Sequence, residues 1–96
     1  MFYAVREVDA TYVPFEFKQW RDIGWYQLSQ GNAREAVLVN TVLVEAFPEV
    51  ADSYRRLADA MVAIHEEEEA IKLLNRCLEL DQEHIQARNL LEQLED

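Results

Sequence analysis

The stretch ADSYRRLADAMVAIHEEEEAIKLLNRCLELDQEH, residues 51–84, holds two amphipathic helical patterns joined by a short polar segment. In each pattern, apolar and small residues return every three or four positions, which places them on one face of a helix. The first face comprises Tyr54, Leu57, Ala58 and Met61, and the second comprises Ala70, Leu74 and Cys77. The stretch therefore predicts two helices that fold back on each other as a hairpin.

The same pattern stands one period earlier, in FKQWRDIGWYQLSQGNAREAVLVNTVLVEAFPEV, residues 17–50. The matching positions of this copy hold Trp20, Ile23, Gly24, Ala36, Leu43 and Pro48. A third copy starts after residue 84 and contributes Ile85, Arg88 and Leu91. Because one hairpin cannot bury its apolar face alone, the copies are expected to stack on each other.

These residues resemble the tetratricopeptide repeat, whose pattern reads W-x₂-L-G-x₂-Y, then A-x₃-F, then P. The resemblance covers residues 17–96 and amounts to about two and a half repeats. Three positions depart from the pattern: Gln27 replaces an aromatic residue, Asn40 a large apolar residue, and Gln82 the proline. The resemblance implies an all-α fold of antiparallel helical hairpins stacked as a short superhelix. The alternative is an unrelated antiparallel helical bundle with an accidental period.

Helices are predicted over residues 17–30, 33–47, 50–64, 67–80 and 83–94. Gly31 is expected to end the first helix in a left-handed conformation, and Asn32 to cap the next one. His65 occupies the place of Gly31 in the second copy, so we expect it near the same conformation. The β-branched run VLVNTVLV, residues 37–44, favours a strand by local propensity, but the repeat register predicts a helix.

Four segments follow from the register: an extended N-terminal segment over 1–16, repeats over 17–50 and 51–84, and a capping helix over 85–96. Trp20 and Tyr54 are expected to do equivalent jobs, each packed between two antiparallel helices beside a small residue. The inward positions of the last helix are Ala87, Leu91 and Leu94, and its outward positions are Gln86, Asn89 and Glu92. A polar outer face is what a terminal helix of a stacked array needs.

The composition limits the partners. Nineteen acidic and nine basic residues give a formal charge of −10, which disfavours binding to nucleic acid and to anionic membranes. No apolar run reaches the length of a membrane span, and the N-terminus lacks the apolar core of a signal peptide. The single cysteine, Cys77, cannot form an internal disulfide. A cytoplasmic protein with neutral or basic protein partners is expected.

An apolar strip is predicted on the second helix, where Leu38, Val39 and Val42 take outward positions that hold mainly polar residues in the later copy. A contiguous exposed apolar patch usually marks a contact surface. Three occupants are open: the N-terminal segment 1–16 of the same chain, a second copy, or an external partner. We expect a homodimer formed through this strip.

The second candidate surface is the concave face formed by the first helix of each hairpin, which the resemblance implies is a peptide groove. The residues expected to bind there are Arg21, Trp25, Ser29, Arg55, Arg56 and Asp59. Aromatic and arginine side chains dominate binding hot spots, which favours Trp25 and the arginines. The alternative is a merely solvated face with Trp25 covered by the N-terminal segment. Some relatives hold a peptide carboxylate with a Lys and Asn set, but Trp25 and Asp59 stand where that set needs Asn.

Catalysis is not expected. The segment His65-Glu66-x-x-Glu69 superficially resembles a zinc-protease helix, but the second histidine is absent and the acidic run suits a helix N-terminus. The sequence shows no phosphate loop, nucleophile elbow or cofactor site. Two functions are left: an adaptor or small chaperone that binds a peptide or helix of a partner, or a self-associating assembly module, either a homodimer subunit or the repeat tail of a larger bacterial enzyme.

Overall fold

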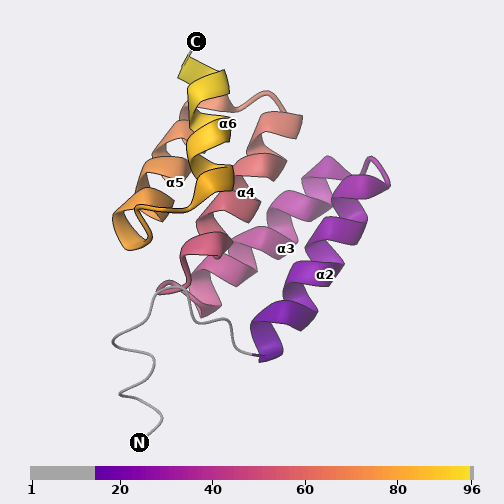
Figure 1. Ribbon diagram of the computed structural model, residues 1–96. Coiled ribbons are helices and arrows are strands. Elements are labelled where there is room, and N and C mark those ends of the chain that lie inside the picture. Colours follow the sequence, from indigo (N-terminus) through magenta and orange to yellow (C-terminus); the bar gives the residue numbers. More distant parts are fainter. Residues whose placement is uncertain (1–14, 96) are drawn as a thin grey trace, which may run out of the picture.

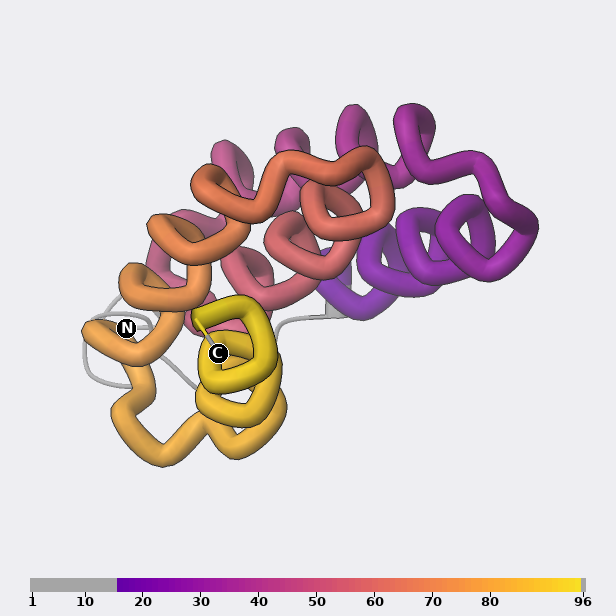
Figure 2. Tube along the Cα trace, turned by 90° about the horizontal axis from the view of Figure 1, so that it is seen from above, coloured from indigo at the N-terminus to yellow at the C-terminus, as the bar shows by residue number. Residues whose placement is uncertain are grey.

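The computed structural model describes residues 15–95, and this part of the chain is all-α (Figure 1). Its helices are α2 (Phe15–Ser29), α3 (Ala33–Ala46), α4 (Ala51–Ala63), α5 (Glu67–Leu80) and α6 (Ile85–Glu95). Each helix packs against the next one along the chain. Figure 2 shows two layers, with α2, α4 and α6 in one and α3 and α5 in the other. The predicted stack of helical hairpins is confirmed.

The helix bounds follow the predicted ones with small differences at the ends. The helix predicted over 67–80 is α5, and its bounds agree. The predicted extended segment 1–16 needs a correction, because Phe15 and Glu16 form the first turn of α2. Residues 1–14 of that segment lie outside the described part of the chain. Differences of one or two residues at a helix end are of the size that fraying produces.

The α2–α3 and α4–α5 turns have the same backbone structure, one repeat apart. Gly31 has φ +83° and His65 has φ +65°, so both take the predicted left-handed conformation. In the first turn, Asn32 donates its backbone N–H to the Gln27 carbonyl at 2.8 Å. In the second, Glu66 donates to Met61 at the same distance. This six-residue hydrogen bond closes a Schellman motif and ends both helices.

Asn32 does not cap α3 as expected. It stands at the N-cap position, but its side chain makes no hydrogen bond to the first turn of the helix. Its Nδ2 instead donates to the Gln27 Oε1 at 2.9 Å, which ties the turn back to α2. Gln27 lies in the last turn of α2, so this polar residue has a local role in place of the usual aromatic residue.

The β-branched run of residues 37–44 is helical, within α3. Ala36, Asn40 and Leu43 form the buried face of this helix, one turn apart. Thr41 donates its hydroxyl to the Val37 carbonyl at 2.7 Å, a common arrangement for threonine in a helix. The propensity cost is at most about 0.7 kcal/mol per residue, which the tertiary packing of the buried face outweighs.

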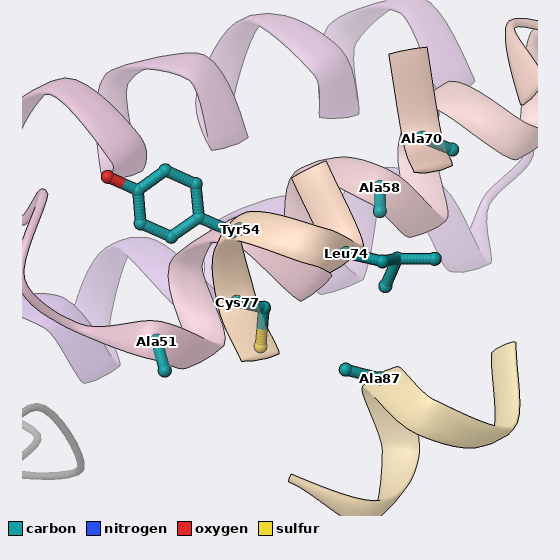
Figure 3. Close-up of a cluster of buried hydrophobic side chains, with 7 residues drawn as sticks. All are labelled: Ala51, Tyr54, Ala58, Ala70, Leu74, Cys77 and Ala87. Carbon is teal, nitrogen blue, oxygen red and sulfur yellow. The ribbon is translucent and has the colours of Figure 1, made fainter. Parts of the chain in front are cut away.

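The main core lies where α4, α5 and α6 meet (Figure 3). It consists largely of small side chains, which let the helix backbones approach closely: Ala51, Tyr54, Ala58, Ala70, Leu74, Cys77 and Ala87. Tyr54 donates its hydroxyl to the Pro48 carbonyl at 2.8 Å, so the buried ring has its polar group satisfied. Burial, with Asp52 and Asp81 nearby, raises the pKa of the Cys77 thiol to about 12. This cysteine is therefore a small apolar residue of the core and a poor nucleophile.

Trp20 and Tyr54 do not have equivalent surroundings, which corrects that prediction. Tyr54 is 8% exposed, whereas Trp20 is 42% exposed. The buried ring between α2 and α3 is Phe17, which packs edge-on against Phe47 with the ring centroids 5.6 Å apart. The difference has a simple cause: α3 covers one side of α4, but no described helix precedes α2.

The capping helix α6 has the predicted orientation. Ala87 is fully buried, and Leu91 and Leu94 pack against the main core. Gln86, Asn89 and Glu92 are exposed. The exposed side chains of the last helix are therefore mainly polar, apart from its first residue, Ile85.

Candidate peptide-binding groove

A pocket of about 330 Å³ opens between the first helices of the hairpins, with one wall from α3. Its lining residues are Gly24, Trp25, Leu28, Asn40, Arg55, Arg56, Asp59 and Gln86. We call this pocket the groove. It brings together four of the six side chains predicted for the concave face, which are Trp25, Arg55, Arg56 and Asp59.

The two other predicted residues do not line the groove. Arg21 forms an exposed ion pair with its neighbour Asp22, at 3.1 Å. Ser29 donates its hydroxyl to the Tyr26 carbonyl at 2.8 Å, within the last turn of α2. Both side chains therefore serve their own helix.

Asp52 connects the polar residues beneath the groove. Its carboxylate accepts from the Arg56 Nε at 2.9 Å and lies 3.4 Å from the Arg55 Nη2. Arg55 also reaches Asp59, with 2.5 Å between its Nη1 and the carboxylate. Burial alone would raise the pKa of Asp52. The opposing effects of Arg55, Arg56 and His84 are larger in sum, so the pKa of Asp52 lies below its ordinary value of 3.8. Both arginines of the groove are thus paired with carboxylates.

His84 links the capping helix to this network. Its Nδ1 accepts the backbone N–H of Ala87 at 3.2 Å, so its Nε2 carries the proton that is donated to Asp52 at 2.9 Å. The imidazole therefore caps the first turn of α6 and ties it to α4. Sequence reasoning missed this role, because Asp52 and His84 are almost one whole repeat apart and no local pattern pairs them.

Asn40 and Gly24 form a matched pair at the wall of the groove. Asn40 is only 3% exposed, and its Nδ2 donates to the Arg56 carbonyl at 3.3 Å. A Cβ on Gly24 would lie 2.6 Å from the Asn40 Oδ1, so glycine leaves the room that the amide occupies. The departure of Asn40 from the repeat pattern therefore has a structural reason. The sequence marked the position as unusual but did not place it in the groove.

Trp25 supplies the exposed apolar surface of the groove. Its side chain is 60% exposed, and Leu28 lies one helical turn further along α2. The groove thus combines an aromatic wall from α2 with a polar, internally paired floor from α4. Such a site can hold a peptide by apolar contact and hydrogen bonds.

Residues 15–95 hold neither a metal-ligand cluster nor a membrane-spanning helix. No group of three or more His, Cys, Asp and Glu side chains in this range is placed to hold a metal ion. None of the helices described above combines the length and the apolar character needed to cross a membrane.

The predicted apolar strip on α3 is only partly exposed. Leu38 and Val42 are exposed, whereas Val39 is half-buried. None of the three residues lines the groove. The strip and the groove are therefore separate surfaces.

The sequence of the chain matches the model of one protein family. The sequence model of the tetratricopeptide repeat matches residues 27–94, which include α3 to α6 and the last turn of α2. A search of curated proteins found no match. Repeats of this family mediate protein–protein interaction and are typically non-enzymatic. The match spans well over half of the sequence and agrees with the observed hairpins, and the chain therefore belongs to the tetratricopeptide repeat family.

Proposed function

We propose that this chain is a non-catalytic adaptor that binds a peptide segment of a partner protein in the groove. The observation that carries the proposal is Trp25, a large aromatic side chain that lines a pocket and is 60% exposed. Aromatic residues of this kind are enriched among binding hot spots. The polar residues of α4 that line the same pocket, Arg55, Arg56 and Asp59, supply hydrogen-bonding groups.

The chemistry of the groove selects the class of peptide. Trp25 and Leu28 favour an apolar side chain in the segment. Arg55 and Arg56 are already neutralised by Asp52 and Asp59, so they offer little attraction for an acidic peptide. The charge of −10 on the whole chain repels acidic partners at long range. The preferred segment is therefore apolar with neutral or basic flanks.

The groove is short, because in the described part of the chain three first helices, α2, α4 and α6, contribute to it. A peptide held over this length makes few contacts and leaves the cost of ordering it poorly offset. We expect dissociation constants in the micromolar range, on the order of 1–100 μM.

Selection from a random peptide library tests the function. Peptides enriched on the wild-type chain should share an apolar residue with neutral or basic neighbours. Replacing Trp25 with alanine should weaken their binding at least about tenfold, because truncating a hot-spot residue costs about 2 kcal/mol or more and tenfold corresponds to about 1.4 kcal/mol. Isothermal titration calorimetry measures the change directly.

The second tryptophan provides a matched control. Trp20 lies on α2 but does not line the groove. In the Trp20→Phe variant, peptide addition should shift the emission of the remaining Trp25. In the Trp25→Phe variant, the emission of Trp20 should stay unchanged. Enrichment of no peptide, or equal affinity for wild type and Trp25→Ala, would reject the proposal.

A further inference from the structure

The first and last described helices of the array differ in the side chains that they expose. The last helix, α6, exposes mainly polar side chains such as Gln86, Asn89 and Glu92, with Ile85 at its start as its one large exposed apolar residue. The first described helix, α2, instead exposes Trp20 and Ile23 along its outer side. Figure 1 shows α2 at the outer edge of the array, with α3 on its inner side. A terminal helix of a stacked array normally needs a polar outer face, and among the described helices none covers the apolar outer side of α2.

The equivalent positions of α4, one repeat later, show what packs against this side of a first helix. Ile23 is 45% exposed, whereas its counterpart one repeat later, Leu57, is 6% exposed. Tyr26 is 57% exposed, whereas its counterpart Ala60 is fully buried. The counterparts are buried because α3 packs against α4. The outer side of α2 is therefore the surface that receives a further helix in the second repeat.

The neighbouring helix α3 extends this surface. Val44 packs against the main core, on the side of α3 that faces the second repeat. At 100° per residue, Val39 and Val42 point roughly to the opposite side, which is the side of the α2 end. Together the two helices form what we call the end face, and its residues are Trp20, Ile23, Tyr26, Val39 and Val42.

Charge is distributed unevenly along the array. Residues 15–50, which contain the end face, carry five acidic and three basic side chains. Residues 51–95 carry eleven acidic and five basic side chains. The half that bears the end face is thus nearly neutral, and most of the negative charge lies toward the other end.

We propose that the end face binds the end face of a second copy, related by a two-fold axis. A two-fold contact is self-complementary and closes after two subunits, as in most soluble homo-oligomers. It would bury the aromatic and β-branched side chains that no described helix covers. It would also place the two acidic halves at opposite ends of the dimer, where their repulsion is smallest.

Dimerisation through the end face leaves both grooves open. Trp25, Arg55 and Asp59 line the groove and belong to none of the end-face positions. The dimer would therefore carry two peptide sites in a fixed arrangement. A partner with two binding segments would gain affinity from simultaneous contact, which offsets the shortness of each groove.

Sedimentation velocity of the full chain tests the proposal. The wild type should sediment as a dimer, with its monomer fraction rising on dilution. Ile23→Lys places a charge in the middle of the end face and should halve the observed mass. Val42→Lys should do the same from α3. The matched control is Ile85→Lys, since Ile85 is 71% exposed on α6 at the other end and should leave the dimer intact.

Thermal unfolding followed by circular dichroism checks that each variant is folded. The end-face substitutions are expected to give a folded monomer, so a loss of mass then reports on the dimer contact. A second measurement does not depend on loss of binding. Ile23→Cys should form a disulfide-linked dimer under mild oxidation, whereas Ile85→Cys should not. Cys77 does not compete, because its thiol is buried.

Three results would overturn the proposal. One is a wild-type monomer up to about 100 μM, above the range of dimers held by a standard-size interface. Another is a dimer that persists in both Ile23→Lys and Val42→Lys. The third is a wild-type monomer that becomes a dimer only when residues 1–14 are deleted, which would make that segment the occupant of the end face.

Discussion

Asp52 connects three side chains of the array through its carboxylate. It lies one turn from Arg55 and Arg56 on α4 and reaches His84 near the start of α6. Its pKa is held below the ordinary value, so its ionised form contributes stability at neutral pH. That contribution is complete above the ordinary pKa of 3.8 and is lost as the pH falls through the lower folded-state value.

We expect Asp52→Asn to lower the free energy of unfolding by about 1.5–3 kcal/mol at pH 7, the range for hydrogen bonds to a charged group. The difference in unfolding free energy between wild type and variant should shrink below pH 4, because the wild-type carboxylate then becomes protonated and is neutral like the asparagine amide. Urea denaturation at pH 7 and pH 3 measures both quantities.

Asp22→Asn is the control for this substitution. Asp22 pairs with Arg21 on the surface and is largely exposed. Exposed pairs contribute little to stability, so this variant should differ from wild type by less than about 0.5 kcal/mol. A pH-independent difference between wild type and Asp52→Asn would contradict the assigned role of the Asp52 carboxylate.

At the scale of the elements, the approach of α2 to α3 depends on Gly24 and Asn40. An alanine at position 24 would meet the Asn40 amide at 2.6 Å, too close for contact with a side chain that is itself packed. We expect Gly24→Ala to destabilise the fold by about 1–3 kcal/mol, the usual cost of overpacking. Thermal or urea unfolding measures it.

A double-mutant cycle separates this clash from a general effect on α2. Asn40→Ala removes the amide, so Gly24→Ala should cost clearly less in that background, with a coupling of about 1 kcal/mol or more. If the effects of the two substitutions on stability add without coupling, the contact between the new Cβ at position 24 and the Asn40 amide is not the cause of the destabilisation.

On the scale of the whole molecule, stability should fall from the middle of the array to its ends. The helices α4 and α5 hold most of the main core and have neighbours on both sides. In a stacked array each repeat is stabilised only by its neighbours, so the terminal helices open first. We expect backbone amides of α2 and α6 to exchange with solvent at least about tenfold faster than those in the middle of α4 and α5.

Native-state hydrogen exchange read by mass spectrometry or NMR checks this gradient, and dilute protein keeps the chain free of self-association. The contrast between α2 and α6 is informative, because dimerisation through the end face would slow exchange in α2 at higher protein concentration but not in α6. Equal protection of all helices at low concentration would show that the array unfolds as one unit.

The sequence by itself determined the helices, their turns and the family. These properties depend on contacts within a few residues or within one repeat: the helical spacing, the left-handed turns at Gly31 and His65, and the small residues of the packed faces. The repeat register also corrected a local error, since it predicted a helix where the β-branched run 37–44 favours a strand. Four groove residues could be named in advance because equivalent positions of stacked repeats lie side by side.

Only the tertiary structure decided which rings are buried and how the polar residues pair. Trp20 and Tyr54 match in sequence, but a helix on the preceding side covers only Tyr54. The same reason exposes Tyr26 and leaves the end face open. The contact of His84 with Asp52 likewise joins residues whose pairing has no local signal. A repeating sequence specifies equal units, but the burial of each unit depends on its neighbours, and the first and last units have a neighbour on one side only.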